Sequence, residues 1–204
     1  MFLPSLDFEK NLWKKGIDYI VGIDEVGRGS WAGPLVATGV ILPKNFKIPQ
    51  GFADSKQLTK KSRESFDKYI REIALGLYIS QITNITINKV GLSKSTQIAF
   101  RQIINRIKPK QEFVLIDAFH IKYLKKSKQT AIIKGDEKCA SIAAASIVAK
   151  VYRDKLMENY KNIYPMYGFE MHKGYGTKFH QEAIQKYGFC QIHRTGYNLN
   201  FMFS

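Results

Sequence analysis

The alternation of apolar and polar positions divides the chain into short strands and longer helices. Runs rich in β-branched and aromatic residues have the length of strands, and stretches with apolar residues at helical spacing, or with a charged helical pattern, predict helices. The expected strands cover 19–23, 35–42, 74–82, 113–116 and 130–133, and the expected helices cover 59–71, 87–107, 138–160 and 177–187. Strands come first and mixed strands and helices follow, which predicts an α/β protein with a mixed sheet flanked by helices.

The Ala-rich stretch 138–160 is the clearest of these helices. Its first half is apolar on nearly all sides, and its second half becomes amphipathic with Arg153, Asp154 and Lys155. This pattern is typical of a helix that packs on a sheet on one side and on other helices on the other. The chain has no internal repeat or Pro/Gly linker, so we expect one domain over residues 1–204, with its core at about 17–197.

A strong excess of positive charge points to a polyanionic partner. The chain has 32 Lys and Arg against 17 Asp and Glu, a formal net charge of +15. Nucleic acid is the first candidate and an anionic membrane surface the second, although a coding bias toward Lys also produces such an excess. The lysines at 122, 125, 126 and 128 fit either a DNA-binding segment or a solvated loop, of which the loop is favoured.

Cysteine usage and the N-terminus indicate a soluble cytoplasmic protein. Cys139 and Cys190 have no metal-ligand spacing and suggest no disulfide framework. The N-terminal residues lack the basic-then-apolar order of a signal peptide, and no apolar run has the length of a membrane span.

Carboxylates follow three of the expected strands and carry the strongest chemical signal. Asp24 and Glu25 end the first strand, Asp117 ends the fourth, and Asp136 follows the fifth. Carboxylates at neighbouring strand ends can converge, and their mutual repulsion is relieved by Mg²⁺ or Mn²⁺, which two-metal phosphodiester hydrolysis requires. The alternatives are turn residues or helix caps, above all for Asp136 before the Ala-rich helix. These residues alone indicate a metal-dependent phosphoryl-transfer enzyme.

Six ordered blocks resemble the ribonuclease HII family. Residues 22–34, GIDEVGRGSWAGP, resemble the opening signature of that family. The other blocks are DSKQL at 54–58, FVLID at 113–117, KGDEK at 134–138 followed by SIAAASIVAKVYRD at 141–154, HKGYGT at 172–177 with His180, and His193-Arg194. The similarity spans roughly residues 17–197.

The resemblance implies a ribonuclease H-like fold with a central five-stranded mixed sheet. It also implies that Asp24, Glu25, Asp117 and Asp136 are both the catalytic residues and the ligands of two Mg²⁺ or Mn²⁺ ions. Asp154 is the rival for the fourth position. It lies inside the long helix, where a charge partner on the helix is the expected use.

A second set of residues is expected to bind the substrate. The resemblance implies that the backbone of Gly27, Arg28 and Gly29 recognises a 2′-hydroxyl and that Tyr175 recognises the RNA–DNA junction. Arg28, Lys56 and Lys173 suit phosphates. Without the resemblance, Tyr175 would be interpreted as half-buried packing and Lys56 as a solvated turn residue.

The function implied by the resemblance is that of an endonuclease. We expect it to cut the RNA strand of RNA–DNA hybrids and to incise 5′ to ribonucleotides in duplex DNA, leaving 3′-hydroxyl and 5′-phosphate ends, as in ribonucleotide excision repair. Its partner is nucleic acid and its expected state a monomer; the sequence names no replication or repair partner. The rivals are a ribonuclease HIII-like enzyme, which has an extra N-terminal domain where this chain has about sixteen residues, and a catalytically silent hybrid-binding module.

Two departures from the family pattern affect the surroundings of the carboxylates. Ala118 and Phe119 stand where the family often has a small Gly-containing turn, and Val26 stands where Ala is more usual. His172, His180 and His193 have no zinc spacing and are expected to form hydrogen bonds. The aromatic tail 197–203 is expected to cover the core.

Overall fold

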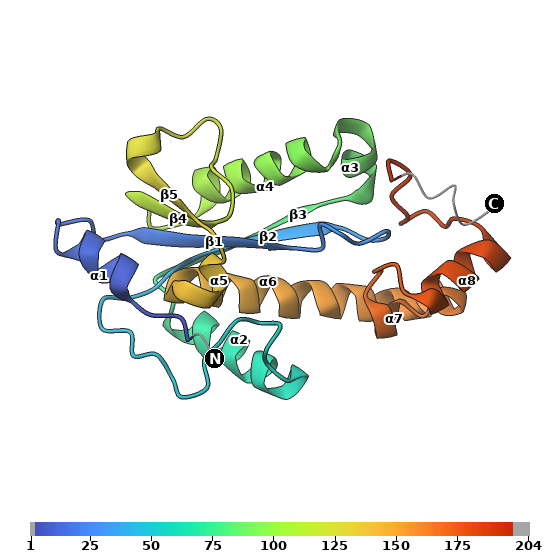
Figure 1. Cartoon of the computed structure of the whole chain (residues 1–204), viewed down its shortest axis with the longest axis horizontal. Helices are drawn as coiled ribbons and strands as arrows, with labels where there is room; N and C mark the ends of the chain where they lie inside the picture. Colours follow the sequence, from blue (N-terminus) through green and yellow to red (C-terminus); the bar gives the residue numbers. More distant parts are fainter. Residues whose placement is uncertain (1–2, 198–204) are drawn as a thin grey trace.

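Five strands form one mixed sheet in the computed structural model, which describes residues 3–197. The strands are β1 (Ile20–Val26), β2 (Leu35–Ile41), β3 (Gly76–Ile82), β4 (Phe113–Asp117) and β5 (Gln129–Ile132). Their order across the sheet is β3-β2-β1-β4-β5 (Figure 1). β2 is antiparallel to β1 and β3, whereas β4 is parallel to both β1 and β5. The predicted five-stranded mixed sheet is confirmed, with β1 at its centre.

Helices cover both faces of the sheet. They are α1 (Asp7–Trp13), α2 (Lys60–Ile73), α3 (Asn84–Val90), α4 (Leu92–Arg106), α5 (Gly135–Lys138), α6 (Ala140–Asn159), α7 (Phe169–His172) and α8 (Lys178–Tyr187), with 3₁₀ turns at Lys126–Lys128, Tyr160–Asn162 and Pro165–Tyr167. In Figure 1, α4 runs over one face of the sheet and α6 along the other, with α2 beyond α6. The predicted position of the Ala-rich helix between sheet and helices is confirmed.

Two predicted helices differ from the observed ones at their N-terminal ends. The helix expected over 87–107 is divided at Gly91, whose φ of 81° ends α3 and leaves α4 to begin at Leu92. The helix expected from residue 138 begins at Ala140, because Cys139 is extended and separates it from the short α5. The short helices α1 and α7 have too few turns to show a helical period in the sequence.

Apolar side chains are packed on both faces of the sheet. Phe100 and Ile103 of α4 belong to one buried cluster, and Ala144 and Ile147 of α6 belong to another. Every residue of β2 is buried. A third cluster, around Met157, fixes the segment that follows α6 against the end of that helix. The sheet therefore holds its strand ends rigidly where the carboxylates lie.

No helix within residues 3–197 is both long and apolar enough to cross a bilayer. The tail for which a core-covering role was expected lies, apart from Tyr197, outside the described residues.

Candidate active site

The sheet brings the four predicted carboxylates together. β1 and β4 are parallel and pair Ile23 with Ile116, so Asp24 and Asp117 follow the same register pair on adjacent strands. Asp136 lies in the first turn of α5, which follows β5 after a short connection, and the preceding Gly135 N–H donates to Asp117 Oδ1 at 2.7 Å. This bond fixes the start of α5 against the end of β4.

Burial and mutual repulsion disfavour full ionisation of the cluster. Asp24 is only 6% exposed, and burial, followed by the charges of Glu25 and Asp117, raises its pKa well above the ordinary value although Ser146 donates to it. Burial also raises the pKa of Glu25 to about 7, against the opposing charge of Arg28. The pKa of Asp117 is raised by burial and by Asp136. The cluster therefore requires positive charge nearby to become fully ionised.

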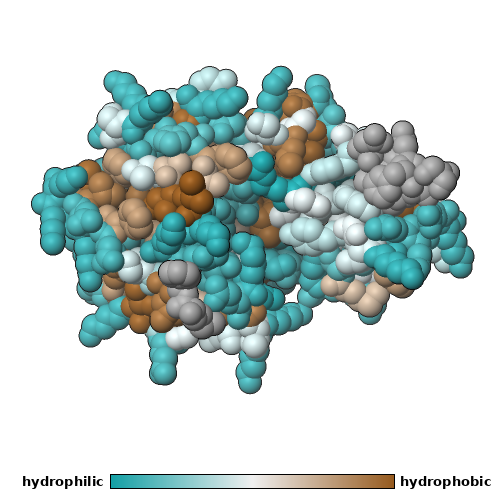
Figure 2. All heavy atoms as spheres, viewed as in Figure 1, coloured by the Kyte–Doolittle hydropathy of each residue, from teal (hydrophilic) through white to brown (hydrophobic). Residues whose placement is uncertain are grey.

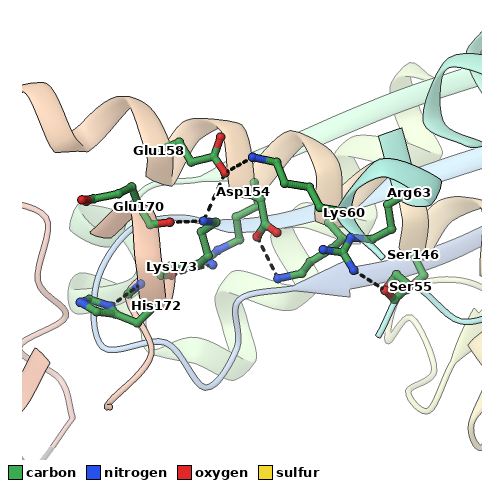
Figure 3. Close-up of polar contacts among 12 residues, drawn as sticks. Ser55, Lys60, Arg63, Ser146, Asp154, Glu158, Glu170, His172 and Lys173 are labelled. Carbon is green, nitrogen blue, oxygen red and sulfur yellow. Dashed lines mark hydrogen bonds and ion pairs between the residues drawn. The ribbon is translucent and has the colours of Figure 1, made fainter. Parts of the chain in front are cut away.

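Lys56 supplies part of that charge, because ion pairs hold the ammonium of its exposed side chain beside the cluster. Its ammonium lies 2.9 Å from Asp136 Oδ2 and 3.9 Å from Asp54 Oδ2. Although partial burial opposes it, the bond to Asp136 raises the pKa of Lys56. Arg63 of α2 holds the segment in place by donating to the Ser55 carbonyl at 3.0 Å, and Ser55 in turn contacts Ser146 (Figure 3).

Asp54 is a fifth carboxylate of this cluster that the sequence did not single out. It is 4% exposed, and burial together with the charge of Asp136 raises its pKa. Its Oδ1 accepts from the Lys56 N–H at 3.2 Å, which shapes the turn that aims the lysine. The available signal was an acidic residue inside a block that resembles the family, next to a lysine.

The donor set fits a hard divalent cation. All its side-chain donors are carboxylate oxygens, and Glu25 Oε2 is buried without a hydrogen-bond partner. Within residues 3–197, however, no three acidic, His or Cys side chains are arranged to surround one ion as they stand. The ammonium of Lys56 and the guanidinium of Arg28, 3.3 Å from Glu25 Oε1, neutralise the cluster instead. Ion binding therefore requires rotation of Asp136 or Lys56 away from their present contact.

The Gly-Arg-Gly segment follows β1 and packs beside this cluster. Gly27 has a φ of 88°, and a side chain there would meet Arg153 Nε at 2.2 Å. Gly29 is different, because a Cβ there would meet nothing within 4 Å. Space is therefore open above Gly29 for a ligand to approach the backbone. The Arg28 guanidinium lies 4.4 Å from the centre of the Phe119 ring.

One of the two departures from the family pattern, the turn at Ala118 and Phe119, has structural consequences here. Ala118 adopts a φ of 55°, the left-handed region that glycine occupies at lower cost. The turn places Phe119, which is 45% exposed and lies two residues after Asp117, against the Arg28 guanidinium.

Arg153 connects the two expected substrate-binding segments, and Arg194 supports the first of them; no sequence pattern indicated either role. Arg153 is fully buried, donates to the carbonyls of Ala32, Pro34 and Lys173 at 2.9–3.2 Å, and lies 5.5 Å from the centre of the Tyr175 ring. Arg194, equally buried, donates to the carbonyls of Gly33 and Arg28.

A chain of neutral histidines supports the segment that carries Tyr175. His180 Nδ1 lies 3.0 Å from the Tyr175 carbonyl and must donate to it, so its Nε2 accepts from His193 Nε2 at 3.1 Å. His193 Nδ1 then accepts from Cys190 N at 2.8 Å. His172 stacks on His180 with ring centres 4.5 Å apart. The hydrogen-bonding role predicted for these histidines is confirmed.

Two predicted ionic residues are engaged away from the carboxylates. Lys173 lies between helices, with its ammonium 3.2 Å from Glu158 and bonded to the Glu170 carbonyl (Figure 3). Its phosphate-binding role stays a prediction. Asp154 pairs with Lys150 one turn earlier at 2.8 Å, so the expected use in a charge pair on the helix is confirmed, although the partner precedes it by four residues instead of lying at i−1 or i+4.

Comparisons with known proteins agree with this geometry. The family model described as Ribonuclease HII matches residues 21–200. Ribonuclease HII of Listeria innocua is 44% identical over 191 residues, covering 94% of this chain and 72% of that protein. Ribonuclease HII of Endomicrobium trichonymphae is 44% identical over 194 residues, covering 95% of this chain and 92% of that protein.

Solved structures share the fold. Ribonuclease H2 from Pyrococcus horikoshii OT3 superposes with a TM-score of 0.73 at 26% identity, covering 88% of this chain and 93% of that one. Ribonuclease HII from Archaeoglobus fulgidus, solved in complex with PCNA, gives a TM-score of 0.75 at 25% identity, covering 89% and 96%. With the family model and the relatives in agreement, the chain belongs to the ribonuclease HII family of metal-dependent ribonuclease H endonucleases.

Proposed function

We propose that this chain cleaves the RNA strand of RNA–DNA hybrids and incises duplex DNA on the 5′ side of an embedded ribonucleotide, leaving 3′-hydroxyl and 5′-phosphate ends. The observation that carries the proposal is the position of the carboxylates of Asp24 and Asp136, which are buried, and of Glu25 and Asp117, which are partly buried, beside the open backbone of Gly29. A hydrolytic cluster and a segment open to close backbone contact thus lie side by side, as cleavage next to a 2′-hydroxyl requires.

The carboxylates would hold two Mg²⁺ or Mn²⁺ ions at the scissile phosphate. When bound, the ions supply an activated water and stabilisation of the departing 3′-oxygen. Asp117 is already oriented by the Gly135 N–H, and Asp24 by the Glu25 N–H at 2.7 Å. Release of Asp136 would free the Lys56 ammonium, whose side chain is 76% exposed, to contact a phosphate oxygen.

Recognition of the ribonucleotide would rest on two segments. The backbone of Gly27, Arg28 and Gly29 would bind the 2′-hydroxyl, and Tyr175 would stack on the deoxyribose 3′ to it. Arg153 lies against both segments and so sets the space between them. We place the enzyme in the cytoplasm as a monomer, in keeping with two unpaired cysteines.

Cleavage of a labelled DNA duplex that contains one ribonucleotide tests the proposal. We expect one cut on the 5′ side of the ribonucleotide in Mg²⁺ or Mn²⁺, no cut in chelator, and no cut in an all-DNA duplex. Cutting of the all-DNA duplex would indicate a different nuclease. Binding without cutting in either metal would favour the silent hybrid-binding module.

A further inference from the structure

Two stretches of the chain that lie together on one side of the sheet carry positive charge and contain no acidic residue. No Asp or Glu occurs in residues 73–111 or in residues 118–135, whereas these stretches contain six and five Lys or Arg, respectively. They form β3, α3, α4 and the connection between β4 and β5. We call its exposed centre the basic face, made of Lys94, Arg101, Lys122, Tyr123, Lys125 and Lys126.

The connection that carries most of the basic face is held firmly on α4. Gln97 of α4 donates to the His120 carbonyl at 3.0 Å and accepts from Lys122 N at 2.9 Å. Within the connection, the buried amide of Gln129 bonds to both the N–H and the carbonyl of Ile121. The lysines are therefore presented from a fixed backbone, which lowers the entropy cost of binding a ligand.

Tyr123 stands at the centre of the basic face. It is 77% exposed, and the Arg101 guanidinium lies 5.2 Å from the centre of its ring. Hollows of about 260 and 280 Å³ flank it, the first also lined by Lys94 and Lys122. Hydrophilic side chains project from the upper edge of the molecule in Figure 2, above α4 and the β4–β5 connection.

The basic face is continuous with the candidate active site. The β4–β5 connection begins at Asp117, passes under Arg28 at Phe119, and reaches the basic face at Lys122. A duplex whose scissile phosphate lies at Asp117 therefore has a cationic surface beside it on this side. No acidic residue in either stretch would repel the phosphates.

We propose that the basic face binds the phosphate backbone of the substrate duplex away from the scissile phosphate. This inference rests on the proposed function, because it assigns a second binding surface to the same substrate. Lys and Arg neutralise phosphates and release condensed counterions, so each contributes to affinity and to its salt dependence without reading sequence. The ring of Tyr123 would pack against a sugar of the backbone, and its hydroxyl would form a hydrogen bond there.

The triple variant Lys122→Gln/Lys125→Gln/Lys126→Gln tests the proposal against a matched control. Lys10→Gln/Lys14→Gln/Lys15→Gln removes the same charge from exposed positions at α1, which packs with Leu115 and Ile142 on the face of the sheet opposite to α4. Cleavage of long and short duplexes with one ribonucleotide is measured over a range of salt. The salt slope is the slope of the logarithm of the apparent affinity against the logarithm of the salt concentration. With the long duplex, the magnitude of this slope should be smaller for the basic-face variant by roughly 2 to 3, about 0.9 for each phosphate that is no longer neutralised. The effect is expected in KM rather than in kcat.

Three results would overturn the proposal. The first is a basic-face variant with the KM and salt slope of the unaltered protein, and the second is an equal shift in both triple variants, which reflects net charge alone. The third is a basic-face variant that no longer binds anionic lipid vesicles but binds the duplex as the unaltered protein does, which would assign the surface to a membrane. Fluorescence anisotropy with the long duplex in chelator measures binding even if no cleavage occurs, so failure of the proposed function is recorded separately.

Discussion

At the scale of single residues, two fully buried arginines organise the candidate site. Arg153 and Arg194 form no ion pair within residues 3–197 and donate mainly to backbone carbonyls, although Nη2 of Arg194 is buried without a hydrogen-bond partner. Burial is the main reason that the pKa of Arg153 falls to about 10. A buried charge of this kind persists only where each bond it makes is well formed. The hydrogen bonds of both guanidiniums therefore hold the Gly-Arg-Gly segment in place against the residues around it.

Replacement of Arg153 should loosen both segments that we propose to bind substrate. Arg153→Met leaves three carbonyls without a donor, which we expect to lower the free energy of unfolding by about 3 kcal/mol, at roughly 1 kcal/mol each. Urea unfolding measures this decrease. Arg153→Lys is the control, since one ammonium cannot reach all three carbonyls and should recover only part of the stability. An Arg153→Met protein as stable as the unaltered one would show that these bonds contribute nothing.

Ala118 offers a test of backbone strain at the end of β4. Its φ of 55° costs an L-residue roughly 1 kcal/mol or more that glycine avoids. Ala118→Gly is therefore expected to raise the free energy of unfolding by about 1 kcal/mol, as measured in urea. Ala183→Gly, in the interior of α8, should lower it by a similar amount. A decrease in stability in both variants would refute strain at Ala118.

The sequence predicted where the carboxylates of the candidate site lie but did not predict that Arg153 is buried. Asp117 ends β4, and Asp24 and Glu25 are among the last three residues of β1, so the apolar runs that precede them were enough to predict that they lie near one edge of the sheet. Arg153 lies in the charged half of an amphipathic helix, where arginine is usually solvated, and its carbonyl partners come from segments distant in sequence. Only the tertiary structure shows such partners.

At the scale of elements, strands were easier to predict than helix boundaries. Apolar runs of four to nine residues with β-branched side chains located all five strands, with boundaries that differ by at most three residues. The division at Gly91 was missed because a single glycine is tolerated inside a helical pattern, and only its positive φ marks the break. The break at Cys139 was missed for a different reason. Its extended backbone depends on contacts with the N-terminal segment, such as the bond from the Ala140 N–H to the Ser5 carbonyl, and these contacts are not visible in the local sequence.

The histidine chain that joins α8 to its flanking segments should make stability depend on pH. Burial lowers the pKa of His180 to about 3 and that of His193 to about 4, below the ordinary value of about 6.5. Between about pH 6.5 and 4 the unfolded chain takes up protons that the folded chain refuses, so the free energy of unfolding falls as the pH falls. Protonation of His180 would also place a hydrogen on its Nε2, which then faces the N–H of His193 Nε2 and can no longer accept a hydrogen bond from it.

Urea unfolding from pH 7.5 to 5 measures this effect. Buried carboxylates such as Glu25, with a raised pKa, contribute with the opposite sign, so the unaltered protein is compared with His180→Gln at each pH. The variant should be less stable at pH 7.5 and lose less stability on acidification. Parallel curves for the two proteins would exclude the histidine chain as a source of pH dependence.

At the scale of the whole molecule, opposite charges are separated. Carboxylates gather at the centre of the sheet, whereas α3, α4 and the β4–β5 connection are free of acidic residues. The net charge of +15 is therefore not spread evenly over the surface. This distribution suits an enzyme that attracts a polyanion broadly and cuts it at one buried acidic point.

The central claim is that Asp136 belongs to the hydrolytic cluster while Asp154 serves only the helix. The most direct measurement is the rate at which Asp136→Asn cuts the single-ribonucleotide duplex in Mg²⁺, beside Asp154→Asn as matched control. Removal of a metal ligand takes away several kcal/mol of transition-state stabilisation, so Asp136→Asn should be slower by about a thousandfold or more. Asp154→Asn, which gives up only its pair with Lys150, should remain close to the unaltered protein. Full activity of Asp136→Asn, or an equal decrease in both variants, would contradict the account.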